Sequence, residues 1–224
     1  MKFLEYTPLA RMNAFLASVN IGGCLVQGVL EAYSCKVAGI DKKLSRSLEQ
    51  EVSAMFHFTY NIMCEYPCSC VSSRRTLIYL ILTLNHMYPD YDFSMLRPHH
   101  FSKEHGILVA KQKIDQYLVE ASKIWSTELG EDIPLIECIW TAIDEVMNLE
   151  DCDVYSYVPD AEADPFANVG SIWSFNYFFY NKKMKRILYF SSRCLSKMSS
   201  EDSSSDDGTN EWGLDFVEGM DLED

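Results

Sequence analysis

The stretch SIWSFNYFFYN, residues 171–181, places six aromatic side chains within eleven positions. Successive side chains of a β-strand point to opposite faces of the sheet, so Trp173, Phe175 and Tyr177 would share one face while Phe178 lies on the other. Neither face of such a strand is wholly polar, which is typical of a central strand buried on both sides. We therefore predict that Trp173, Phe175 and Tyr177 belong to the structural core.

A second strand, MKRILYFSSRC (184–194), follows at once and predicts an antiparallel hairpin with a tight turn at Asn181-Lys182. The turn region carries four cations, which are Lys182, Lys183, Lys185 and Arg186. The simplest interpretation of this basic hairpin is a solvated tip. Two functional alternatives are part of a nuclear-import signal and a basic patch that meets an acidic partner.

The rest of the chain alternates between helical and extended patterns. Apolar periodicity predicts helices over 7–23, 41–56, 72–88, 107–126 and 132–147. Extended segments are expected over 24–36, near 95–100, and over 152–160, 171–181 and 184–194. Strands at both ends and in the middle, with helices between them, predict an α/β three-layer sandwich. Its mixed or antiparallel central sheet would have about five strands, with helices on both faces.

Charge is distributed unevenly over the 224 residues, whose formal net charge is −14. Residues 199–224 contain ten acidic residues and no Lys or Arg, while the remaining 23 acidic and 19 basic residues nearly balance. This pattern predicts a single globular domain over 1–198, with a variable loop near 53–72, and a disordered acidic tail over 199–224. It argues against specific nucleic-acid binding, which requires a strongly basic face.

The tail contains candidate phosphorylation sites. Ser199, Ser203 and Ser204 each have an acidic residue three positions later, a spacing that acid-directed kinases favour. Each phosphate would add about −1.5 to −2 charges at neutral pH. Apolar side chains from Trp212 to Met220 interrupt the acidic run, so the hypothesis is that this segment docks transiently on the basic hairpin or on a basic partner.

Chemical sites are scarce in this sequence. Cys64, Cys68 and Cys70 lie close together, and His57 would complete a set of four zinc ligands, but the spacing fits no common zinc module. Phosphate-binding, dinucleotide-binding and serine-hydrolase motifs are absent, so we expect neither enzymatic activity nor a cofactor. No signal peptide or membrane-spanning stretch is expected, and we predict a monomer.

Four blocks in one order carry a family resemblance: EAYSCKVAG (31–39), SSRRTLIYLILTLNHMYPDYDFS (72–94), DVYSYVPDAEADPF (153–166) and IWSFNYFFYNKKMKRI (172–187). Together they resemble the Maf-one family, the eukaryotic repressor of RNA polymerase III transcription, and the opening MKFLEYTPLARMNAFL is similar to plant members. Asp90, Tyr91, Asp92 and Asn176 are the matched motif residues. We expect the turn at 89–92 to be chiefly structural, with Asp92 capping local N–H groups.

The resemblance implies a three-layer fold without catalysis, and a nuclear protein that shuttles with the cytoplasm. It implies binding to RNA polymerase III, with the initiation factor as a further partner, and control by kinases and phosphatases. The cysteine-rich segment near 53–72 departs from the family, whose loop there is polar and serine-rich. The alternative from another class is a single-stranded RNA-binding adaptor that uses the aromatic strand and the basic hairpin.

Overall fold

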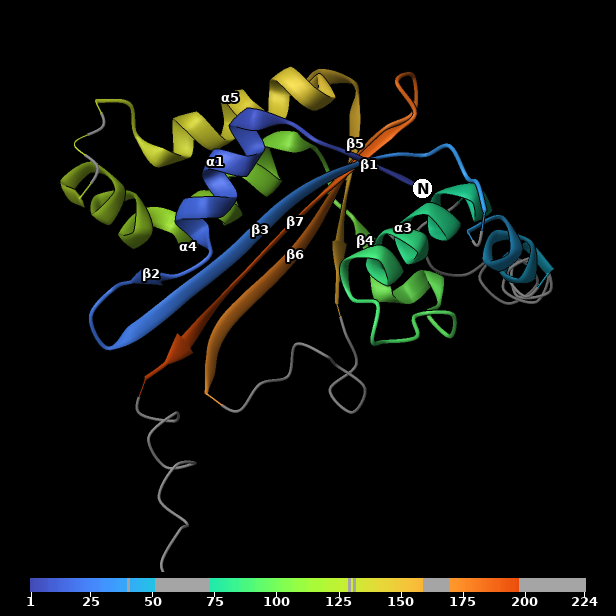
Figure 1. Ribbon diagram of the computed structural model, residues 1–224, viewed down its shortest axis with the longest axis horizontal. Coiled ribbons are helices and arrows are strands. Elements are labelled where there is room, and N and C mark those ends of the chain that lie inside the picture. The colour runs from blue at the N-terminus through green and yellow to red at the C-terminus, as the bar shows by residue number, and fades with distance from the viewer. Residues whose placement is uncertain (40, 51–72, 129, 131, 159–169, 198–224) are drawn as a thin grey trace, which may run out of the picture.

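A seven-stranded sheet organises the molecule in the computed structural model, which describes residues 1–39, 41–50, 73–128, 130, 132–158 and 170–197 (Figure 1). The strands are β1 (Lys2–Leu4), β2 (Val19–Asn20), β3 (Cys24–Ser34), β4 (Phe101–Lys103), β5 (Cys152–Tyr157), β6 (Ser171–Asn181) and β7 (Arg186–Ser196). Their order is β1-β3-β7-β6-β5-β4, and β2 also pairs with β3. All these pairs are antiparallel.

Three long strands form the centre of this sheet. β7 pairs along its whole length with β3, from Arg186 opposite Ser34 to Ser196 opposite Cys24. On its other side β7 pairs with β6, with one register shift between Ser171 and Trp173. Strand β6 is therefore an interior strand, as its aromatic pattern predicts.

The helices α1 (Thr7–Leu16), α4 (Ile107–Glu128) and α5 (Leu135–Met147) cover one face of the sheet (Figure 1). Their apolar stripes pack with one another and with the inward side chains of the long strands. The strand residues in this core are Val26, Leu30, Ala32, Val154, Phe175, Tyr177, Phe179, Leu188, Phe190 and Cys194. We call this side the covered face.

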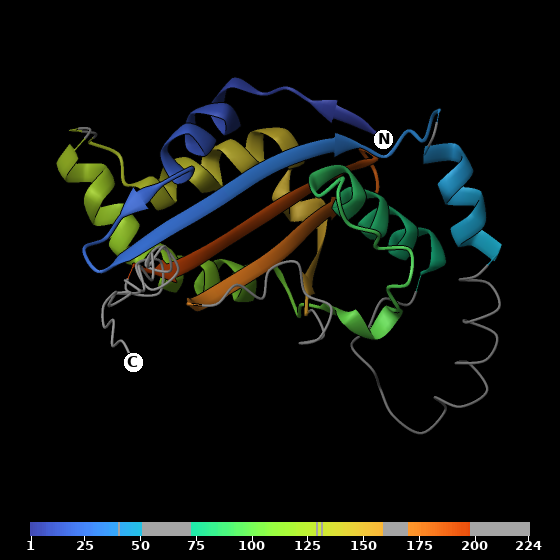
Figure 2. The same ribbon diagram turned by 60° about the horizontal axis from the view of Figure 1, so that its bottom comes forward.

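Helix α3 (Arg74–Met87) packs on the opposite side of the sheet. Ser73 begins it, because its hydroxyl accepts a hydrogen bond from the Thr76 N–H at 3.5 Å. This second core, on what we call the α3 face, is rich in tyrosine: Tyr33, Tyr155, Tyr157, Tyr180 and Tyr189 all belong to it. A helical segment at 41–50 lies beyond α3 (Figure 2). Its Asp41 contacts His86 of α3 at 3.1 Å and forms an ion pair with the amino group of Met1.

A side-chain amide closes part of the outer edge of β3. Asn13 of α1 accepts a hydrogen bond from the Leu30 N–H at 2.7 Å and donates one to the Leu30 carbonyl at 2.8 Å. Leu30 lies between the two short parts of β3 that pair with β1 and with β2. The amide therefore satisfies backbone groups that a longer neighbouring strand would otherwise bind.

The predicted three-layer α/β sandwich is confirmed, with helices on both faces of one sheet. Within the described residues the sheet has seven strands rather than about five, and its pairs are antiparallel, which is one of the two arrangements predicted. The sequence pattern missed β1 and β2, because two or three residues are too few to display alternation. The predicted two-residue turn is wider, since residues 182–185 separate β6 from β7.

Candidate functional site

The turn after α3 presents an acidic and aromatic surface. Pro89 stops the helix, and Asp90, Tyr91 and Asp92 are exposed, with 49% of Tyr91 accessible to solvent. The Asp92 carboxylate accepts a hydrogen bond from the Ser94 N–H at 2.9 Å, so it stabilises the turn. Asp90 makes no polar contact among the described residues. Local contacts therefore stabilise the turn, while the Asp90 carboxylate and the Tyr91 ring remain accessible to a partner.

Asn176, the fourth motif residue, lies elsewhere. It is buried on the α3 face of β6, where its side-chain oxygen accepts a hydrogen bond from the Tyr189 hydroxyl at 2.6 Å. The Tyr189 hydroxyl lies 3.3 Å from that of Tyr88, the residue that precedes Pro89. Complete burial raises the pKa of Tyr189 well above its usual value, so its hydroxyl remains a neutral donor.

Tyr88 and Tyr189 therefore connect Asn176 to the exposed turn. Tyr88 also packs its ring on Phe93 and, edge to face, on Tyr189. Sequence reasoning missed both tyrosines. The signal that would have found them is that a buried Tyr hydroxyl or Asn amide needs a polar partner.

The basic hairpin is largely neutralised by its own neighbours. Lys182 binds Asp153 at 2.6 Å, and Lys183 binds Asp151 at 2.6 Å. Arg186 donates a hydrogen bond to the Val146 carbonyl at 2.7 Å, in the last turn of α5. Burial alone would raise the pKa of Asp153, but Lys103 and Lys182 together hold it below its usual value. Only Lys185, among the four cations, has no side-chain partner in the described part of the chain.

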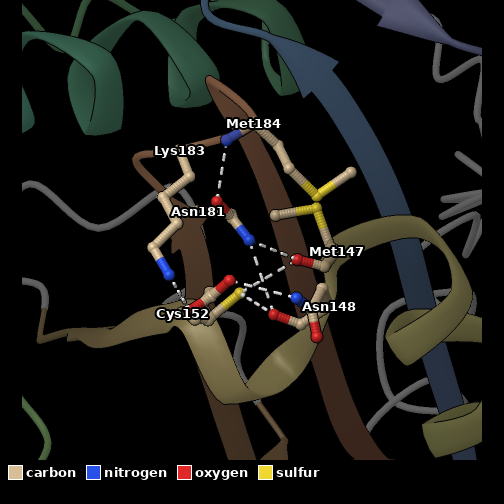
Figure 3. A network of polar contacts seen from close by, with 7 residues as sticks. Met147, Asn148, Cys152, Asn181, Lys183 and Met184 are labelled. Carbon is tan, nitrogen blue, oxygen red and sulfur yellow. Dashed lines mark hydrogen bonds and ion pairs between the residues drawn. The ribbon is translucent and has the colours of Figure 1, made fainter.

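A buried amide fixes the shape of this hairpin (Figure 3). Asn181 donates to the Met147 carbonyl at 2.7 Å and accepts from the Met184 N–H at 2.9 Å. The Cys152 thiol also donates to the Met147 carbonyl, at 3.5 Å. Asn181 thus holds the hairpin on the carboxyl end of α5, a role that its position in a turn did not reveal.

The aromatic side chains of β6 differ in burial. Phe175 and Tyr177 are buried at 6% and 5% exposure beneath α4 and α5. Trp173 is only partly buried, contrary to the prediction that it lies in the core. It sits at the margin of the covered face, where its ring packs on Tyr117 of α4 with centroids 4.9 Å apart. Trp173 keeps the face and register of Phe175, since it pairs with Cys194 as Phe175 pairs with Ser192, but it lies near the start of β6.

Several predicted residues lie outside the described residues. These are the zinc candidates His57, Cys64, Cys68 and Cys70, the variable loop as far as residue 72, and the tail serines Ser199, Ser203 and Ser204. Within the described ranges, no three His, Cys, Asp or Glu side chains are grouped so as to hold a metal ion. Nor is any helix in those ranges long and apolar enough to cross a membrane.

The fold places this protein in the class of three-layer α/β proteins with an open antiparallel sheet. The polar clusters described above stabilise turns of the protein itself. The chain belongs to the Maf1 family, because the family model described as the Maf1 regulator matches residues 26–191.

Relatives and solved structures agree with this assignment. The chain is 36% identical to the Schizosaccharomyces pombe protein named repressor of RNA polymerase III transcription maf1, covering 96% of this chain and 89% of that protein. It is 31% identical to the Dictyostelium discoideum repressor of RNA polymerase III transcription, covering 88% and 86%. A crystal structure of citrus MAF1 is 48% identical, with a TM-score of 0.70, and covers 85% of this chain and 99% of that one.

Proposed function

We propose that this protein represses RNA polymerase III transcription by binding the polymerase and impairing its recruitment to promoter-bound initiation factors. The observation that carries the proposal is the match, over nearly the whole chain, to relatives named as repressors of that polymerase. The match extends over the sheet and both helical layers.

The exposed turn at 89–92 is the surface that we propose for contact with the polymerase. Asp90 and Tyr91 are exposed and project from a turn that Asp92 and the partly buried Tyr88 hold in place. A rigid loop with a carboxylate and an aromatic ring suits a basic partner surface with an apolar pocket, since little side-chain order must be lost on binding. Met95, 65% exposed, extends the apolar part of this surface.

The geometry supports protein binding over the RNA-binding alternative. Bases need exposed ring faces on which to stack, but Phe175, Tyr177 and Phe179 lie beneath helices. Three of the four hairpin cations already bind acidic side chains or a carbonyl oxygen. Phosphates would have to compete with those contacts.

Two assays test the proposal. Purified full-length protein is added to a reconstituted polymerase III reaction, and its binding to the isolated polymerase is measured beside a titration with single-stranded RNA. We expect transcription to fall and polymerase to bind, with weak or no RNA binding. Unchanged transcription would refute repression, and RNA binding without polymerase binding would favour the adaptor.

A charge-only double variant tests the turn. Asp90→Asn with Asp92→Asn removes both charges but keeps an oxygen that can cap the Ser94 N–H. We expect weaker polymerase binding with an unchanged unfolding midpoint, whereas the control Glu145→Gln, an exposed acid on α5, leaves binding unchanged. Equal binding by the double variant would restrict the turn to a structural role.

Regulation and localisation belong to the same proposal. Phosphorylation at Ser199, Ser203 or Ser204 would weaken polymerase binding, and the protein would shuttle between nucleus and cytoplasm. Binding assays with Ser→Asp variants test the first point. Replacing Lys182, Lys183, Lys185 and Arg186 by Gln in a reporter fusion tests whether the hairpin aids nuclear entry, and a fusion that stays nuclear would exclude that role.

A further inference from the structure

The α3 face divides into two halves. Antiparallel register places side chains in rows across β3 and β7, and near α3 the row Tyr33–Ile187 is buried. Farther along, the rows Val29–Ser191, Gln27–Arg193 and Leu25–Leu195 run toward the end of β7. Figures 1 and 2 show α3 beside one end of these strands, while the other end extends away from it.

We call this second part the open half-face and define it by six residues: Leu25, Gln27, Val29, Ser174, Arg193 and Leu195. They share a face because strand side chains alternate, with Val26, Leu30 and Cys194 pointing to the covered face. All six are partly or fully exposed. A cavity of about 260 Å³ opens here, lined by Ala17, Gln27, Gly28, Val29, Tyr88, Ser191 and Arg193.

Arg193 places a positive charge within this surface. Its Nε and Nη2 donate to the side-chain oxygen of Gln27 at 3.1 and 2.9 Å, so its described partner is a neutral amide. Arg193 forms no ion pair with a carboxylate within the described residues. Glu31, the nearest carboxylate along this side of β3, accepts a hydrogen bond from the Tyr33 hydroxyl. The amide orients the guanidinium and leaves its charge available to an anion.

The chain itself supplies an acidic segment next to this surface. β7 ends at Ser196, and Lys197 is held there by Gly23 and Asn20, through hydrogen bonds of 3.0 and 2.6 Å. The following residues include EWGLDFVEGM (211–220), in which Trp212, Leu214 and Phe216 alternate with other residues and Asp215 and Glu218 lie close by. Fewer than fifteen residues separate Lys197 from this segment, and random-coil statistics give a chain of that length an end-to-end distance of about 20 Å, enough to reach the half-face.

The basic hairpin is a poorer site for the same segment. It lies at the opposite end of β7, and ten residues of strand correspond to roughly 33 Å. Lys182, Lys183 and Arg186 already have partners within the protein. Both distance and competition therefore favour the open half-face.

We infer that residues 211–220 dock within the same molecule on the open half-face, with Asp215 or Glu218 paired to Arg193 and apolar side chains against Leu25, Val29 and Leu195. The short link gives the segment an effective concentration in the millimolar range, so weak contacts suffice. The docked segment covers apolar and charged surface that is otherwise open to a partner.

Fluorine NMR on the full chain labelled with 5-fluorotryptophan tests this inference. The protein has four tryptophans, and Trp212→Phe assigns the resonance of interest. We expect the Trp212 resonance to be displaced from the free-indole position at low salt and to move toward it at high salt, because screening weakens the ion pair. In Arg193→Gln the docked-to-free ratio should fall roughly tenfold.

Matched variants keep the inference falsifiable. Lys185→Gln removes the unpartnered hairpin cation and should leave Trp212 unchanged, whereas Asp215→Asn with Glu218→Gln should release it without altering the sheet. The resonances of Trp125, Trp140 and Trp173 report whether each variant folds. A free Trp212 signal in the unmodified chain, a response to Lys185→Gln alone, or a docked fraction that rises with protein concentration would overturn intramolecular docking on this face.

Discussion

The two faces of the sheet differ in chemistry although the same three strands form both. The covered face receives aliphatic and aromatic side chains beneath three helices, and Phe179, Leu188 and Phe190 there have no exposed surface. The α3 face receives mainly tyrosines under one helix and then opens onto Gln27 and Arg193. The difference predicts that stability comes chiefly from the first face, while the second leaves more polar surface accessible to solvent.

The covered face should give the largest loss of stability on truncation. Phe179 has no exposed surface and packs edge to face on Trp140 at 6.0 Å, so Phe179→Ala should cost about 3–5 kcal/mol in unfolding free energy. Chemical denaturation measures it, with Ile172→Ala as control because that side chain is 56% exposed on the same strand. Equal effects of the two variants would contradict the assignment of the main core to this face.

The hydrogen bond between Tyr189 and Asn176 on the α3 face should give the second-largest loss of stability when it is removed. Tyr189→Phe removes the donor to Asn176 and leaves a buried amide oxygen without its partner, at a cost of about 1–3 kcal/mol. A double-mutant cycle with Asn176→Ala isolates the pair. If the losses of unfolding free energy in the two single variants add up to the loss in the double variant, the 2.6 Å hydrogen bond contributes no coupling energy.

Alkaline pH should weaken the tyrosine-rich core. Burial, followed by Asp153, raises the pKa of Tyr155 to about 12. An unfolded Tyr ionises near 10, so this stabilisation is complete below about pH 10 and is lost as pH rises toward 12.

Denaturation midpoints across this range test the sign. By pH 11 the loss from Tyr155 should be on the order of 1 kcal/mol, so Tyr155→Phe should show a shallower decline than the unmodified protein. Tyr91→Phe, which alters a half-exposed ring, is the control. A decline of equal slope in Tyr155→Phe would show that this hydroxyl is not protected by burial.

Arg193→Gln should have the smallest effect on folding. Its contacts are to a neutral amide at a partly exposed site, so we expect less than about 1 kcal/mol in unfolding free energy. The same substitution should nevertheless change the Trp212 resonance. A large destabilisation would mean that the half-face is a structural element rather than a binding surface.

Residues with strong local patterns could be placed from the sequence. The aromatic alternation of 171–181 indicated an interior strand, and Ser73 and Pro89 bracketed a buried helix. The alternation also placed Trp173 on the correct face, but it could not show that this residue lies at the margin of the core, because the extent of the covering helices is set by the tertiary structure. Asn181 and Tyr189 were also beyond reach, since their partners lie in other elements, 34 and 13 residues away in sequence.

What the sequence by itself determined is the three-layer architecture, the family and the separation of a balanced body from an acidic tail, because periodicity, motif order and charge are local properties of the chain. Only the tertiary structure decided which cations remain available. Lys182 and Lys183 bind Asp153 and Asp151 from a neighbouring strand and turn, whereas Arg193 of β7 faces the amide of Gln27 on β3. The role of a charge depends on the groups brought within a few ångströms of it, and for Arg193 the pairing of β3 with β7 sets those neighbours across 166 residues of sequence.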